Sequence, residues 1–246
     1  MSALHYTTAT LSRAGGREYN EDALGFRESA VAGGCWVLAD GLGGHGGGEV
    51  ASRLAVETLL HGCESETPCD AAQIHSVLEQ VEQTIRTTQQ SDPRLRQMRA
   101  TLTALFCHAD QALWVHIGDT RLYHLRAGRI RFQTADHSVP WALLRAGEIT
   151  RAEVRHHEDR NRLLRTLGND KPLRPEILAQ PEPLQAGDAF LLCSDGFWEY
   201  VSETEMEVAL CKSSSPEAWL QQMELIVLQR SADDHDNYSA LGVWVR

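Results

Sequence analysis

Two apolar runs in this chain each end at an aspartate followed by a glycine, and this feature constrains the fold most. Residues 35–39 lead into Asp40-Gly41, and residues 190–194 lead into Asp195-Gly196. A continuous apolar run of this length, stopped by a breaker, is typical of a buried strand. Such a strand carries its last side chain to the rim of a sheet, so the sequence predicts a carboxylate at the end of each of two strands.

Two further acidic clusters occur near the ends of the chain, Asn20-Glu21-Asp22 and Asp236-Asn237. Carboxylates gathered from distant segments repel one another unless a positive charge lies between them. Hard divalent cations such as Mg²⁺ and Mn²⁺ prefer oxygen ligands of this type. A single Asp-Gly is more often a simple turn, but two copies that both end apolar strands indicate a metal-dependent enzyme.

The composition excludes several other classes of protein. The 246 residues are 42% hydrophobic and 23% charged, without a Pro-, Ser- or charge-rich linker, which fits one domain as well as two small ones. A net charge of −11 argues against nucleic acid or an anionic membrane surface as partner. Neither a signal-peptide pattern nor an apolar run of ~18 residues is present, so we expect no membrane insertion. Six cysteines without a C-x-x-C pair favour reduced thiols and a cytoplasmic location.

The chain alternates between helical and strand-like segments. Helices are predicted over 48–61 and 71–89, the second with Asp70 as N-cap and Gln73 at N3. Four short strands follow, over 101–108, 112–117, 121–126 and 129–133. Their connections are too short for crossover helices, so we predict that successive strands are antiparallel neighbours.

The second half continues the mixture of elements. Residues 139–165 are predicted to form a small excursion from the core, and a strand begins at 189. Two late helices carry the capping signals Ser202…Glu205 and Ser215-Pro216, and an alternating strand covers 238–245. Antiparallel strands and paired helices in separate blocks predict an α+β fold.

Six short motifs in one order give the chain a family resemblance. They are Arg17-x-x-Asn20-Glu21-Asp22, Ala39-Asp40-Gly41-x-Gly43-Gly44-His45, Gly118-Asp119-Thr120-Arg121-x-Tyr123, Asp136-His137-Ser138, Ser194-Asp195-Gly196 and Asp236-Asn237. From about Arg17 to the C-terminus, the sequence resembles the bacterial metal-dependent type-2C serine/threonine protein phosphatases. The resemblance implies one catalytic domain over 1–246, built as a four-layer αββα sandwich. Its two antiparallel sheets would be flanked by helix pairs, with a flap at about 139–165 and the metals at one end.

The resemblance also implies a set of metal ligands. Asp40 would bridge two core ions of Mn²⁺ or Mg²⁺, Asp195 and Asp236 would complete one of them, and the carbonyl of Gly41 would bind the other. Asp119 resembles the ligand of a third, weaker ion, which it would share with Asp195. Such ions keep much of their hydration.

The resemblance further implies a role for three residues near the N-terminus. Glu21 and Asp22 would hold metal-bound waters, and Arg17 would bind the substrate phosphate with its planar fork. Arg17, Asp22 and Asp40 are therefore the expected catalytic residues.

The expected reaction is hydrolysis of phosphoserine and phosphothreonine by direct attack of a metal-bridging hydroxide. The resemblance implies phosphorylated proteins as substrates, a Ser/Thr kinase as the opposing enzyme, and a monomer. One position departs from the family pattern: eukaryotic relatives have a histidine directly after the first Asp-Gly, where this chain has Leu42. The general acid is therefore open, with a metal-bound water as the default and His45 expected to be structural.

Two other functions compete with this one. Residues 41–46 match G-x-G-x-x-G after a strand and before a helix, which is the fingerprint of a dinucleotide-binding Rossmann domain. The adjacent Asp40, the lack of an acid-ended strand ~20 residues on and the hairpin-linked strands argue against it. A catalytically silent domain that binds phosphoproteins is the other alternative.

Overall fold

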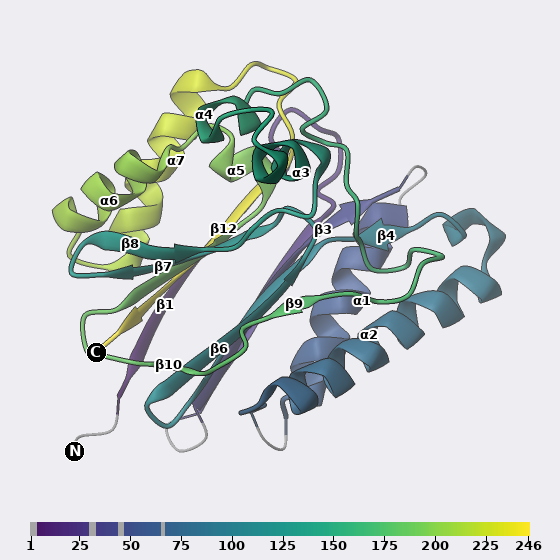
Figure 1. Cartoon of the computed structure of the whole chain (residues 1–246), viewed down its shortest axis with the longest axis horizontal. Coiled ribbons are helices and arrows are strands. Elements are labelled where there is room, and N and C mark those ends of the chain that lie inside the picture. The colour runs from purple at the N-terminus through teal and green to yellow at the C-terminus, as the bar shows by residue number, and fades with distance from the viewer. Residues whose placement is uncertain (1–3, 30–32, 44–46, 65–66) are drawn as a thin grey trace.

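Two antiparallel β-sheets face each other, and helices cover the outer surface of each sheet (Figure 1). The computed structural model describes residues 4–29, 33–43, 47–64 and 67–246. Every strand pair within these ranges is antiparallel, which contradicts the parallel order of a Rossmann domain. The α+β sandwich predicted from the sequence is therefore confirmed.

The first sheet has five strands. Their order is β1 (Tyr6–Arg13), β12 (Tyr238–Val245), β11 (Ala189–Cys193), β7 (Arg121–Arg126) and β8 (Arg129–Gln133). The second sheet has the order β10 (Glu182–Pro183), β6 (Gln111–Ile117), β5 (Leu102–His108), β3 (Gly33–Leu42) and β2 (Asp22–Ser29). Two short strands extend this second sheet, β4 (Arg99–Ala100) on β3 and β9 (Glu176–Ile177) on β6.

Pairs of long helices form the outer layers. Helices α1 (Gly47–Gly62) and α2 (Ala71–Ser91) pack on the second sheet, and α6 (Glu203–Lys212) and α7 (Pro216–Arg230) pack on the first. The short elements are η1 (Pro93–Leu95), α3 (Val139–Ala146), α4 (Arg151–Val154) and α5 (Asp195–Trp198). None of the helices in the described ranges is long and apolar enough to cross a membrane.

The predicted caps begin these helices. The carboxylate of Asp70 accepts a hydrogen bond from the backbone N–H of Gln73 at 2.8 Å. Ser202 and Glu205 form the capping box of α6, and the Ser215 hydroxyl accepts from the backbone N–H of Ala218 at the start of α7.

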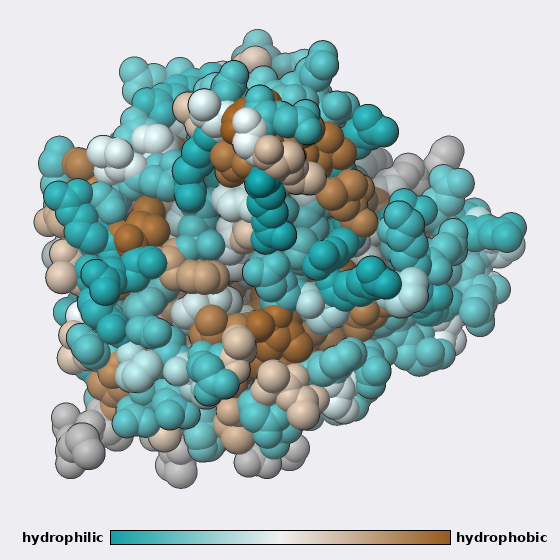
Figure 2. Space-filling model, viewed as in Figure 1, coloured by the Kyte–Doolittle hydropathy of each residue, from teal (hydrophilic) through white to brown (hydrophobic). Residues whose placement is uncertain are grey.

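Apolar side chains fill three separate layers, one beneath each helix pair and one between the sheets. On the face in Figure 2, the surface is mostly hydrophilic, with apolar residues gathered over α3 and along the seam between the sheets. All six cysteines are free in the structure.

One predicted pairing is wrong. Strands β5 and β6 are neighbours, as are β7 and β8, but β6 and β7 lie in different sheets. The link 118–120 therefore crosses from one sheet to the other, with Gly118 at a φ of 101°. A short link excludes a crossover helix, but it does not distinguish a hairpin from a chain that changes sheet at the end of a sandwich.

Two further differences concern the first strands of the chain. Strand β3 does not stop at Asp40, because Gly41 and Leu42 continue it and pair with β4. Strands β1 and β2 were not anticipated. Strand β1 carries the alternation Tyr-Thr-Thr-Ala-Thr-Leu, whose β-branched residues are the signal that could have revealed it.

Candidate active site and metal centre

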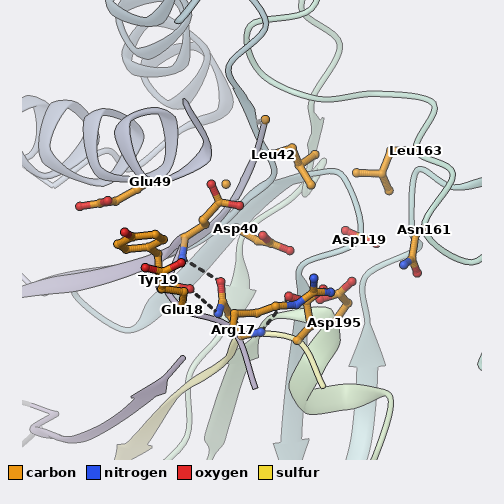
Figure 3. Close-up of a pocket in the computed structure, with 15 residues that line it drawn as sticks. Arg17, Glu18, Tyr19, Asp40, Leu42, Glu49, Asp119, Asn161, Leu163 and Asp195 are labelled. Atoms are coloured by element: carbon orange, nitrogen blue, oxygen red, sulfur yellow. Dashed lines mark hydrogen bonds and ion pairs between the residues drawn. The ribbon is translucent and has the colours of Figure 1, made fainter. Parts of the chain in front are cut away.

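Carboxylates from distant segments meet around one cavity of about 700 Å³ at one end of the sandwich. Figure 3 shows Asp40, Asp119 and Asp195 directed toward a common space, with Arg17 below them and Leu42 and Leu163 on the opposite side. The acidic residues that line the cavity are Glu18, Glu21, Asp40, Glu49, Asp119, Asp195 and Asp236. With the exception of Asp22, every predicted site residue lines this cavity: Arg17, Glu21, Asp40, Gly41, Asp119, Asp195 and Asp236.

Asp22 is the exception, because it lies beside the cavity rather than in its lining. The register of β2 and β3 places it directly opposite Asp40. Its Oδ2 accepts a hydrogen bond from the Ser194 hydroxyl at 2.8 Å, whereas its Oδ1 is buried without a hydrogen-bond partner. A buried carboxylate oxygen without a donor indicates that another partner is required at this point.

Burial and mutual repulsion shift the titration of this group of carboxylates. Burial first, and the charges of neighbouring aspartates second, raise the pKa of Asp40 and Asp195 well above its usual value. Burial likewise raises the pKa of Asp119 to about 7, with Asp136 adding to the rise, and the pKa of Asp22 to about 6. A divalent cation would remove this repulsion, and carboxylate oxygens are the ligands that Mg²⁺ and Mn²⁺ prefer. The residues present therefore fit such ions.

The start of α1 approaches the site so closely that only glycine fits. A Cβ on Gly41 would lie 2.0 Å from the carbonyl oxygen of Gly48, and a Cβ on Gly48 would lie 2.6 Å from Oε1 of Glu21. Burial raises the pKa of Glu21, although the backbone N–H groups of Glu49 and Gly48 bond to its carboxylate and oppose the rise. Gly41 and Gly48 thus let the N-terminus of α1 meet Glu21.

Arg17 is exposed and forms an ion pair with Asp236, whose Oδ2 lies 3.2 Å from its guanidinium. Among the described residues that line the cavity, it is the only lysine or arginine. It is therefore the group best suited to bind an anion there, and a bound phosphate would compete with Asp236 for it.

Asn237 organises the loop that carries Arg17, a role that sequence reasoning missed. Its Oδ1 accepts from the backbone N–H of Glu21 at 2.8 Å. Its Nδ2 donates to the carbonyls of Ala14 and Tyr19 at 2.8 and 2.9 Å. No local pattern signals this role, because the side-chain hydrogen bonds of Asn237 all reach residues that are remote in the sequence.

No histidine lies among the described residues that line the cavity. Leu42 occupies the lining, and His45 lies outside the described residues. Asn161 and Leu163 from the predicted flap complete the wall opposite Glu49 (Figure 3).

A second group of potential metal ligands consists of His116, His137 and Glu176, whose ligand atoms lie within 4.8 Å of one another. The two imidazole rings stack nearly parallel, at 10° and 4.6 Å between centroids. Imidazole binds metals through a nitrogen lone pair in the ring plane, so parallel stacked rings are poorly arranged to share one ion.

Hydrogen bonds explain this group better. Nε2 of His116 bonds to the carbonyl of Ala135 at 2.7 Å, and Nδ1 of His137 accepts from the backbone N–H of Gly118 at 3.2 Å. Burial lowers the pKa of His137 to about 3, so the ring is neutral. We interpret the group as a support for the Gly118 turn.

Comparison with known proteins gives a consistent result. A family model described as protein phosphatase 2C matches residues 12–232. The chain is similar to the serine/threonine phosphatase stp of Listeria monocytogenes serotype 4b (strain F2365), with 35% identity over 199 residues, 79% of this chain and 78% of the relative. It is 34% identical over 195 residues to the serine/threonine protein phosphatase PstP of Mycobacterium tuberculosis, which covers 79% of this chain and 36% of that protein.

Solved structures agree with this similarity. The crystal structure of the M. tuberculosis phosphatase PstP/Ppp superposes with a TM-score of 0.84 and 31% identity, covering 98% of each chain. The PstP catalytic domain in complex with two manganese ions gives a TM-score of 0.83 and 31% identity, over 98% of this chain and 99% of that one.

Proposed function

The chain belongs to the protein phosphatase 2C family and is a metal-dependent serine/threonine protein phosphatase, and on this premise we propose that the cavity around Asp40 is its active site. The observation that carries the proposal is the convergence of buried carboxylates with raised pKa values beside one available cation, Arg17. Such a site is costly to fold unless divalent ions bind there.

The charges of four other aspartates act on Asp40, and we propose that it would bind both of two core ions of Mn²⁺ or Mg²⁺. Asp195 and Asp236 would bind one of these ions, the carbonyl of Gly41 would bind the other, and Asp119 with Asp195 would bind a third more weakly. When bound, these ions supply Lewis acidity toward the phosphoryl oxygens and lower the pKa of water. Glu21 and Asp22 would act through water, which fits the position of Asp22 beside the cavity.

The protein's own residues then bind and orient the substrate. Arg17 exchanges its ion pair with Asp236 for two hydrogen bonds to the substrate phosphate. Asn237 keeps the loop of Arg17 in place, which limits the entropy lost on binding. The Leu42 side chain cannot donate a proton, so the leaving oxygen must obtain its proton from another group.

The direct test is hydrolysis by the purified protein. We expect it to hydrolyse p-nitrophenyl phosphate and phosphothreonine peptides with Mn²⁺ or Mg²⁺, and to lose this activity in EDTA. Restored activity after the metal is returned is the control for irreversible damage. Activity that survives EDTA would refute the proposed site.

We further propose that its substrates are proteins phosphorylated by a bacterial Ser/Thr kinase, and that it acts in the cytoplasm as a monomer. The six free cysteines support a reducing compartment. Phosphoproteomes with and without the gene would identify the substrates, and unchanged phosphoserine and phosphothreonine sites would contradict this role. Sedimentation at micromolar concentration would contradict the monomer if it gave twice the monomer mass of 27.4 kDa.

A further inference from the structure

We propose that Trp198 is a positioning residue that fixes Asp119 relative to Asp195 and thereby sets the affinity of the weakest metal site. The inference rests on the proposed function, in which these two aspartates share an ion. Asp119 belongs to the link between the sheets, and Asp195 to helix α5. The two residues are 76 positions apart in the numbering and reach the cavity from different elements.

Beyond the pairing of the adjoining strands β7 and β11, which ends at Arg121 and Cys193, one side-chain hydrogen bond joins these two segments. Trp198 lies in the same helical turn as Asp195, and its Nε1 donates to the backbone carbonyl of Asp119 at 2.9 Å. The Trp198 side chain has no other polar atom, and the residue is 2% exposed. The rigid indole therefore holds helix α5, which carries Asp195, at a fixed distance from the turn that carries Asp119.

Neighbouring side chains hold the indole in this orientation. The guanidinium of Arg121 lies over the ring at 3.5 Å from its centroid. Arg121 is held in turn by two hydrogen bonds to Asp136, at 2.9 and 2.8 Å. The pair of Arg121 and Asp136 is buried, so the guanidinium is held against the face of the ring.

The turn at Gly118 and helix α5, which the indole joins, are each also held by other hydrogen bonds. The Gly118 end of the turn is held by His137, whose backbone N–H donates to the Gly118 carbonyl at 2.8 Å. Helix α5 is tied to the predicted flap through Arg160, which donates to Glu199 at 2.8 Å. Removing the indole N–H should therefore leave the fold in place while Asp119 loses its fixed distance from α5.

The chain offers a closely matched control. Trp219 on α7 is also fully buried, and its Nε1 donates to the carbonyl of Met206 at 3.0 Å. It lies in the core beneath α6 and α7 and does not line the cavity. Trp198→Phe and Trp219→Phe remove the same atoms and one hydrogen bond of the same type.

The experiment compares these two variants with the wild type in calorimetric titrations of the metal-stripped protein with Mn²⁺. In W198F we expect the weakest binding event to lose affinity by about threefold to tenfold, the equilibrium equivalent of one neutral hydrogen bond. The tight events should keep their affinity, and W219F should keep all of them. Both variants should lose a similar amount of thermal stability.

Kinetics provide the second readout. At limiting Mn²⁺, W198F should show a lower kcat for a phosphothreonine peptide with KM unchanged, and a high Mn²⁺ concentration should restore kcat. Equal weak-site affinity in W198F and W219F would overturn the inference while leaving the proposed function intact. A wild type without metal-dependent hydrolysis would instead overturn the proposed function.

If W198F does not fold, a second variant, Arg121→Lys, tests the same inference. Arg121→Lys keeps the charge beside Asp136 but removes the planar group that packs on the indole. We expect the same direction of change in the weak site, and an unchanged affinity would overturn the inference.

Discussion

Asp119→Asn should make the metal-free protein more stable at neutral and alkaline pH. Burial, with a contribution from Asp136, raises the pKa of Asp119 from 3.8 to about 7. The folded protein thus binds this proton more tightly than the unfolded chain does. The contribution of the protonated Asp119 to the free energy of unfolding is fully present below pH 3.8 and is lost as the pH rises to about 7.

The size of the effect follows from the two pKa values. The difference between 3.8 and about 7 corresponds to about 4 kcal/mol of unfolding free energy at most. Because the neighbouring carboxylates titrate together, we expect ~2–4 kcal/mol for this one group. Asparagine has nearly the same shape and no charge, so the variant should escape this loss. The advantage over the wild type should be small at pH 4.5 and largest at pH 8.

Urea unfolding in EDTA at these two pH values measures the difference. Asp110→Asn, a change of the same type in an exposed turn, is the control and should show no such pH dependence. With saturating Mn²⁺ the order should reverse, because only the wild-type carboxylate binds the ion. An Asp119→Asn advantage that is equal at pH 4.5 and 8 would refute the electrostatic reasoning.

Four other substitutions test the proposed roles. Arg17→Ala should weaken phosphate binding by ~1.5–3 kcal/mol, the range for charged hydrogen bonds, and an unchanged inhibition constant for inorganic phosphate would place Arg17 outside the site. Asp40→Asn and Asp236→Asn should each abolish turnover with an unaltered circular dichroism spectrum, and full activity in either would reject that ligand. Asp119→Ala should retain the tight metals by calorimetry and lose most turnover on phosphopeptides. It should lose less on p-nitrophenyl phosphate, whose leaving group needs little protonation, so equal losses would support a purely structural turn.

Several elements of the fold could be predicted from the sequence because their signals are local. Asp70 and Ser202 begin helices through contacts with residues three positions later, so the pattern is complete within a few residues. The apolar runs before Asp40 and Asp195 likewise specify buried strands without knowledge of their partners. Sequence motifs therefore identified five of the seven acidic residues that line the cavity, and missed Glu18 and Glu49.

Tertiary structure alone decided how these pieces are joined. Burial of two sheets against each other, rather than the length of a link, determines that residues 118–120 change sheet and carry Asp119 into the cavity. The contacts of Asn237 and Trp198 join segments that are remote in the chain, so no local pattern could indicate them. The raised pKa of Asp119 has the same origin, because it depends on burial and on charges that only the packed fold brings near. The sequence determined which side chains are present, and long-range packing determined their distances and their protonation.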